Sequence, residues 1–125
     1  MPRSKLVLAV WALAVAFFGI GGVWAFVDPA GFYDSLATFP PFNRHFLRDA
    51  GSFQLGIAAT LLAALRWRSG TLVALVGASA ASVVHAVSHI IDRDEGGRTS
   101  DHFLLWGLSV LLVAATIVQA REEEP

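Results

Sequence analysis

The sequence predicts an all-α protein: a four-helix transmembrane bundle with a short interfacial segment between its first and second helices. Four stretches are long and apolar enough to cross a hydrocarbon core of about 30 Å, which takes roughly 20 helical residues. Hydrophobic residues make up 55% of the chain and charged residues 15%, and the mean hydropathy is +0.60, which is typical of membrane proteins. The spans use nearly all of the 125 residues, so we expect a single integral membrane domain over residues 1–125.

The first predicted span covers about residues 6–27, with Arg3 and Lys5 before it and Asp28-Pro29 after it. Its apolar run is longer than the roughly 7 to 15 residues of a signal-peptide core, and no small-x-small cleavage pattern follows it. We therefore expect this span to be retained. The segment from Arg66 to Gly70 predicts a tight turn between the second and third spans. The other three predicted spans cover about residues 48–65, 71–91 and 102–120.

The connection over residues 28–47 is long and rich in aromatic side chains. Asp28 can cap a short helix that has Pro29 at its first position, and Pro40-Pro41 would stop that helix. Such a segment lies in the membrane interface. Two roles are open, an ordinary aromatic belt at headgroup depth and a lid over the bundle. The aromatic residues are Phe32, Tyr33, Phe39, Phe42 and Phe46.

The charge and the cysteine content exclude several classes of function. The net charge is −1, so no basic field is present to gather nucleic acid, and we expect no nucleic-acid partner. The chain has no cysteine, which excludes disulfide exchange, cysteine-ligated zinc, iron–sulfur clusters and thiol nucleophiles. Any redox chemistry therefore needs a bound metal, a haem or a quinone.

The basic residues divide five against four between the two predicted membrane faces. By the positive-inside rule we expect a multi-pass protein of the cell membrane with both termini in the cytoplasm and every histidine on the outward side. The two groups are Arg3, Lys5, Arg66, Arg68 and Arg121 on one face, and Arg44, Arg48, Arg93 and Arg98 on the other.

The third span contains the sharpest motif, in which His85, His89 and Asp92 project from one stripe of the helix near its outer end. Ala81 and Gly77 continue that stripe inward, and such small residues let a neighbouring helix approach closely. All four histidines fall where the second, third and fourth spans meet. The candidate site residues in this layer are His45, Asp49, His85, His89, Asp92, Asp101 and His102.

Imidazole and carboxylate groups from adjacent helices hold zinc, iron, copper or manganese in helix bundles. We expect His85 and His89 as the central ligands and His45 or His102 as the third. Asp49 and Asp92 would be either ligands or acceptors that fix the imidazole tautomers. A site with an open position could activate water or bind a small redox partner, whereas a saturated site would be structural.

Other interpretations of the histidines remain open. A b-type haem between two histidines on different helices also satisfies the sequence, with His45, His85, His89 and His102 as the cofactor-binding set. The histidines and carboxylates could instead form a hydrogen-bonded cluster that only organises the bundle, or they could be plain interfacial residues. Ionisable groups inside a membrane are costly, which favours a bound cofactor or an organised cluster.

The segment Asn43–Gly56, with the sequence NRHFLRDAGSFQLG, resembles small uncharacterised four-span membrane proteins grouped loosely with the DoxX-like superfamily. The resemblance covers the topology and this one segment. It implies a link to quinone-coupled sulfur oxidation or to membrane redox homeostasis. The cysteines that redox members use are absent from this chain, so the resemblance carries no thiol chemistry to it.

The sequence thus predicts an integral membrane protein that binds a transition metal ion, with haem as second choice, for a redox or hydrolytic step on a lipid or quinone-like substrate. No catalytic residue is predicted, because no serine–histidine–acid triad lies at matched depth. The competing hypothesis is a non-enzymatic subunit that assembles or gates a larger membrane complex. A transporter or proton relay would need a homo-oligomer, for which Gly77 and Ala81 could provide the contact.

Overall fold

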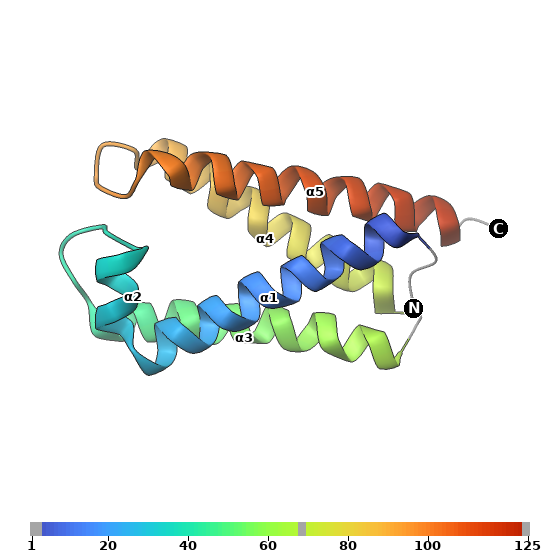
Figure 1. Ribbon diagram of the computed structural model, residues 1–125, viewed down its shortest axis with the longest axis horizontal. Coiled ribbons are helices and arrows are strands. Elements are labelled where there is room, and N and C mark those ends of the chain that lie inside the picture. Colours follow the sequence, from blue (N-terminus) through green and yellow to red (C-terminus); the bar gives the residue numbers. More distant parts are fainter. Residues whose placement is uncertain (1–3, 68–69, 124–125) are drawn as a thin grey trace.

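A computed structural model describes residues 4–67 and 70–123, and within these residues the fold is all-α, as predicted. Four long helices lie lengthwise, and a short helix caps one end of the molecule (Figure 1). The helix α1 begins and the helix α5 ends at the opposite end. The helices are α1 (Lys5–Val27), α2 (Pro29–Ser35), α3 (Arg44–Arg66), α4 (Thr71–Ile91) and α5 (Thr99–Glu123).

The helix bounds follow the predicted spans closely, and their differences have local causes. The helix α4 has the predicted bounds. The helix α3 begins before the predicted Arg48 because the side chain of Asn43 caps it, accepting the N–H of Phe46 at 3.0 Å. The helix α5 begins at Thr99, where the carboxylate of Asp101 accepts the N–H of Arg98 at 2.9 Å.

The short helix α2 forms as predicted, since Asp28 caps it through the N–H of Gly31 at 3.0 Å and Pro29 occupies its first turn. The helix ends at Ser35, before the proline pair. Residues 68–69 of the predicted turn between the second and third spans lie outside the described residues. Arg3, predicted to precede the first span, lies outside them as well.

Three of the described helices, α1, α4 and α5, are long and apolar enough to cross a membrane. This length and composition indicate a membrane protein. The helix α3 is not among them, although it was predicted as the second span. Its first two turns carry Arg44, His45, Arg48 and Asp49, which lower its hydropathy below that of a lipid-exposed span.

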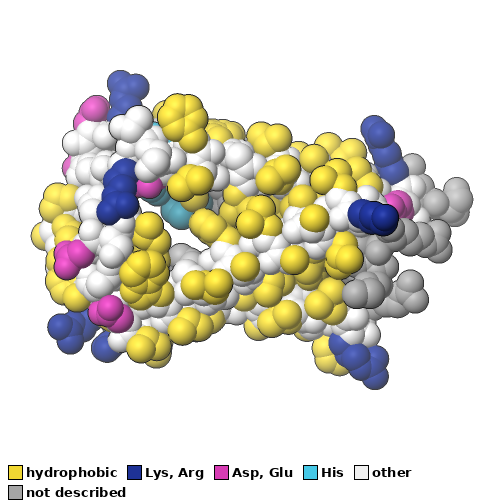
Figure 2. Space-filling model, in the orientation of Figure 1, with side chains coloured by type: hydrophobic (Ala, Val, Ile, Leu, Met, Phe, Trp, Pro, Cys, Tyr) yellow, Lys and Arg dark blue, Asp and Glu magenta, His cyan; other side chains and the backbone are white. Residues whose placement is uncertain are grey.

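The surface has the distribution of side chains expected of a protein that lies across a bilayer. Apolar side chains cover the middle of the molecule, and Lys and Arg side chains gather at its two ends (Figure 2). Large hydrophobic residues such as Ile20, Val73 and Val110 are more than 60% exposed. Lipid tails are as apolar as these side chains, so their exposure costs nothing in a membrane.

The long helices form two antiparallel pairs, in which α1 packs mainly on α3 and α4 mainly on α5. Hydroxyl groups join the second pair. Ser82 Oγ lies 2.9 Å from Ser109 Oγ, and Ser79 Oγ lies 2.8 Å from Thr116 Oγ1. Interhelical hydrogen bonds of this kind help to hold membrane helices together, where the hydrophobic effect contributes little.

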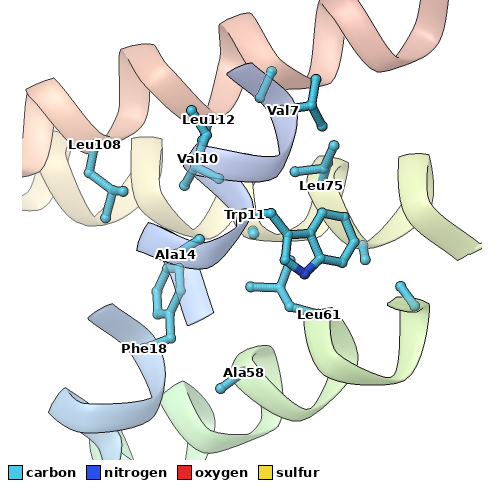
Figure 3. Close-up of a cluster of buried hydrophobic side chains, with 14 residues drawn as sticks. Val7, Val10, Trp11, Ala14, Phe18, Ala58, Leu61, Leu75, Leu108 and Leu112 are labelled. Carbon is cyan, nitrogen blue, oxygen red and sulfur yellow. The ribbon is translucent and has the colours of Figure 1, made fainter. Parts of the chain in front are cut away.

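The two pairs meet in one apolar core near the end of the molecule where α1 begins and α5 ends. Trp11 of α1, Leu61 of α3, Leu75 of α4 and Leu112 of α5 are almost completely buried there (Figure 3). Toward α2 the pairs diverge, and the surface is hollowed between α5 and the α1–α2 end, with histidine side chains visible inside (Figure 2). The core therefore holds the bundle at one end and leaves a recess at the other.

Candidate functional site

His85 and His89 lie one turn apart near the end of α4, and their rings face each other. Their Nε2 atoms are 3.2 Å apart, and the ring centroids are 4.9 Å apart with an interplanar angle of 65°. Without a metal, one Nε2 carries a proton and donates a hydrogen bond to the other Nε2, which is unprotonated. A neutral imidazole has one donor nitrogen and one acceptor nitrogen. Helix geometry alone produces this arrangement, since residues four apart share one face.

The same separation fits two ligands of a metal ion. At a zinc–nitrogen distance of about 2.0 to 2.1 Å, two nitrogens at the tetrahedral angle lie about 3.3 to 3.4 Å apart. The observed 3.2 Å between the Nε2 atoms of His85 and His89 is close to this value. The pair can therefore either share a proton or chelate a cation without a change in the backbone.

His102 lies in the first turn of α5, beside His89. Its ring centroid lies 6.2 Å from that of His89, at an interplanar angle of 89°. Two imidazoles on one tetrahedral ion have centroids about 5 Å apart, so His102 lies farther from His89 than a shared ion requires and must move closer to join as a third ligand. The carboxylate of Asp101 lies within electrostatic range of His85 and His89, and that of Asp92 within range of His89.

The loop between α2 and α3 reaches His89. The ring of Phe39 packs edge-on against His89, with centroids 5.2 Å apart at 89°. Beside it, the N–H of Gly97 donates to the carbonyl of Thr38 at 3.1 Å, which ties this loop to the α4–α5 loop. Phe39 therefore lies against one imidazole of the pair, and the roles of the aromatic segment as a belt or a lid stay predictions.

Gly97 is the residue that permits this contact. Its φ is +80°, in the left-handed region that favours glycine. A Cβ at this position would also lie 2.6 Å from Cζ of Phe39. The contact between Phe39 and His89 was not predicted from the sequence. The Gly96-Gly97 pair is the signal in the sequence that marks the close approach of two loops.

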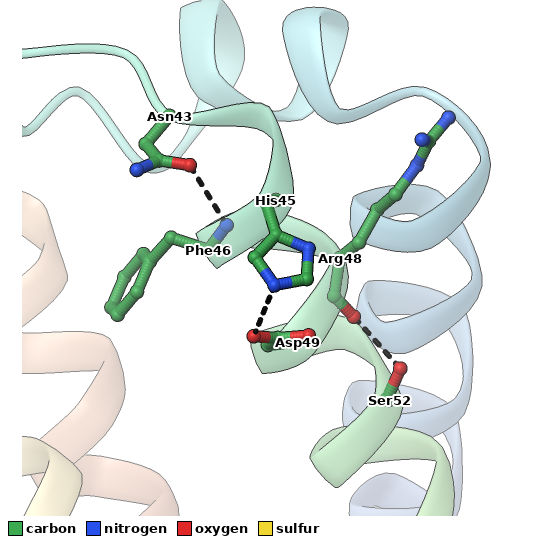
Figure 4. Close-up of polar contacts among 6 residues, drawn as sticks. All are labelled: Asn43, His45, Phe46, Arg48, Asp49 and Ser52. Carbon is green, nitrogen blue, oxygen red and sulfur yellow. Dashed lines mark hydrogen bonds and ion pairs between the residues drawn. The ribbon is translucent and has the colours of Figure 1, made fainter.

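The structure keeps His45 and Asp49 apart from this group. They form an ion pair at 3.4 Å at the start of α3, with side chains 87% and 54% exposed (Figure 4). Among residues 4–67 and 70–123, neither makes a hydrogen bond, ion pair or ring contact with the histidines of α4 and α5. Their role as ligands stays a prediction. The neighbouring Arg48 donates from Nε to the carbonyl of Phe26 at 3.3 Å, linking α3 to α1.

The candidate site thus consists of His85, His89 and His102, with Asp92 and Asp101 nearby and Phe39 above. Within the described part of the chain, no three His, Asp or Glu side chains already stand close enough together to hold a metal ion. The Nε2 atoms of His85 and His89 have the spacing of two metal ligands. His102 has to move closer to them to become the third ligand.

The chain matches no family model, no curated protein and no solved structure. The resemblance of residues 43–56 to the DoxX-like superfamily therefore stays a prediction.

Proposed function

We propose that the chain crosses the membrane four times, as a multi-pass protein of the cell membrane with both termini in the cytoplasm. The helix α3 packs lengthwise against α1, which is long and apolar enough to span. Each of these two helices has 23 residues, so they reach across the same depth. Contact with α1 shields one face of α3 from lipid, which supports a crossing helix of lower hydropathy.

We further propose that the recess binds a transition metal ion. The observation that carries this proposal is the separation of 3.2 Å between the Nε2 atoms of His85 and His89. His102 supplies the third nitrogen after its side chain moves closer to His89. Asp92 and Asp101 provide negative charge that favours a bound cation. The set of nitrogen and oxygen donors suits zinc, iron, copper or manganese.

The geometry favours a single metal ion over haem. Two axial imidazoles bind haem iron from opposite faces of the ring system. The Nε2 atoms of His85 and His89 face each other at 3.2 Å, which leaves no room for a porphyrin between them. A haem would have to be held by His102 and one residue of the pair.

The function that we propose is a redox or hydrolytic step on a lipid or quinone-like substrate. A bound metal with an open position supplies Lewis acidity or electron transfer at such a site. The recess lies near the end of the apolar belt, where a lipid-soluble molecule presents its polar head (Figure 2). Phe39 restricts access of water to His89, and its displacement admits the substrate head.

Titration with Co²⁺ tests the metal site, because cobalt bound by nitrogen ligands in a tetrahedral site has strong visible absorption bands. We expect these bands in the purified wild-type protein and their loss in His85→Ala and His89→Ala. The matched control His45→Ala removes an exposed imidazole outside the group and should leave them unchanged.

The alternative is a non-enzymatic subunit in which the histidines only organise the bundle. The distance of 3.2 Å between the Nε2 atoms also suits a hydrogen bond, and this observation favours the alternative. A metal-free wild-type protein that binds no Co²⁺ and copurifies with other membrane subunits would support it and overturn the metal proposal.

A further inference from the structure

One outer face of the bundle has a groove of about 400 Å³ between α3 and α4. Ser52, Gly56 and Thr60 line it from α3 at intervals of four residues, and Gly77 lines it from α4. The side chain of Phe53 stands beside it and is 76% exposed. This face therefore combines a groove lined by small residues with one large, exposed aromatic side chain beside it.

The bundle does not use Gly56 and Gly77 for its own packing. A Cβ built on either residue would meet nothing within 4 Å. Gly22 and Gly51 differ, since a Cβ on either would meet the backbone of the other helix at 3.0 Å or less. Small residues in membrane helices serve close helix approach, and at Gly56 and Gly77 none of the described helices makes that approach.

The same side of α3 is unfavourable for contact with lipid, because it carries ionisable side chains. Asp49 lies about one turn and His45 about two turns above Ser52, and both side chains are more than half exposed. Ionisable side chains that face lipid are costly unless protein covers them. Ser52 and Thr60 add no such cost, because their hydroxyls donate to the carbonyls of Arg48 and Gly56 at 2.9 Å.

We propose that this face binds a second copy of the chain, with α3 packed on α3 of that copy around a two-fold axis along the membrane normal. The charges are self-complementary, because the axis brings His45 of each copy to Asp49 of the other, and two equivalent ion pairs between the copies replace the pair that each copy forms within itself. The shapes are self-complementary as well, because Phe53 of each copy enters the groove over Gly56 and Gly77 of the other.

This inference rests on the proposed crossing of α3 and not on the metal site. Membrane depth is checked separately with a Gly56→Cys variant of this cysteine-free chain. A membrane-impermeant thiol reagent should fail to label it in intact cells and label it after solubilisation in denaturant. Labelling in intact cells would show that α3 does not cross, and would overturn the inference.

The direct experiment counts copies per particle in native-membrane nanodiscs by single-molecule photobleaching. We expect two copies for the wild type and a loss of dimer on the order of tenfold for Gly56→Leu and Gly77→Leu. Gly107→Leu on α5 is the matched control, because a Cβ at Gly107 also meets nothing within 4 Å. It should remain dimeric, which separates blocked docking from general damage to the fold.

Cysteine crosslinking locates the contact. Ser52→Cys should form an oxidised dimer in membranes, whereas Val110→Cys, on an exposed site of α5, should not. Monomers throughout would mean that lipid fills the groove, and stoichiometric binding of a different subunit would mean that another protein does. Equal crosslinking at both positions would mean random encounter. Each of these results overturns the proposal.

Discussion

The backbones of Gly22 and Gly51 are in direct contact where α1 crosses α3. A Cβ on Gly22 would lie 3.0 Å from the carbonyl oxygen of Gly51, and a Cβ on Gly51 would lie 2.8 Å from that of Gly22. Neither position can hold a side chain unless a helix moves. This contact sets the separation of α1 and α3, and so the position of the end of α3 that carries Arg48 and Asp49.

We expect Gly51→Ala to destabilise the bundle by about 1 to 3 kcal/mol, the usual cost of an extra methyl group in a packed contact. Gly107→Ala is the control, since its new Cβ meets nothing within 4 Å, and removal of a helix-interior glycine should stabilise it by about 0.5 to 1 kcal/mol. Unfolding in mixed micelles with increasing denaturing detergent measures both values. Equal stability of the two variants would contradict the contact.

The hydroxyl pair between α4 and α5 gives a second prediction. Ser109 donates its proton to the carbonyl of Leu105 at 2.8 Å, so the proton in the 2.9 Å contact with Ser82 comes from Ser82. A double-mutant cycle with Ser82→Ala and Ser109→Ala should give a coupling of about 0.6 kcal/mol, as for other hydrogen bonds between membrane helices. Strictly additive effects would show that this bond contributes nothing to the pairing of the helices.

Removal of the Phe39 ring should expose His89. We expect Phe39→Ala to raise the rate at which diethyl pyrocarbonate acylates His89, because the phenyl ring covers that imidazole. Phe42→Ala is the control, because its ring packs on Tyr33 instead. Peptide mass spectrometry after timed modification measures the rate at each histidine. Unchanged reactivity of His89 in Phe39→Ala would mean that the loop does not restrict access.

Metal binding should weaken in acid. An imidazole binds a metal only in its deprotonated form, so two histidine ligands make the affinity fall by up to about 100-fold per pH unit once both are protonated in the free protein. Co²⁺ titrations between about pH 8 and pH 5 measure this dependence. An affinity that stays constant over this range would mean that the histidines are not ligands.

The hydropathy and periodicity of the sequence predict most of the fold. They place α4 at its observed bounds, and they identify α1 and α5 to within a few residues. The start of α3 was predicted four residues late, because the cap at Asn43 lies in a polar segment that a hydropathy argument excludes. Residues 44–47 belong to the helix through that hydrogen bond and not through apolar content.

The candidate site could be predicted only where one helix determines it. His85 and His89 are brought together by the pitch of α4, so their spacing in the sequence is sufficient. The relation of His45 to them depends on how far the two helix pairs diverge. That divergence follows from the position of the shared core around Trp11, which holds the two pairs together at one end only and which no periodicity reveals.

The most direct test of the metal site is an anomalous scattering map from crystals of the protein grown with Zn²⁺. The proposal predicts one peak in the recess, about 2.0 to 2.1 Å from Nε2 of both His85 and His89, with His102 moved toward it. A map in which the recess is empty and zinc lies only elsewhere, for example at His45 and Asp49, would contradict it.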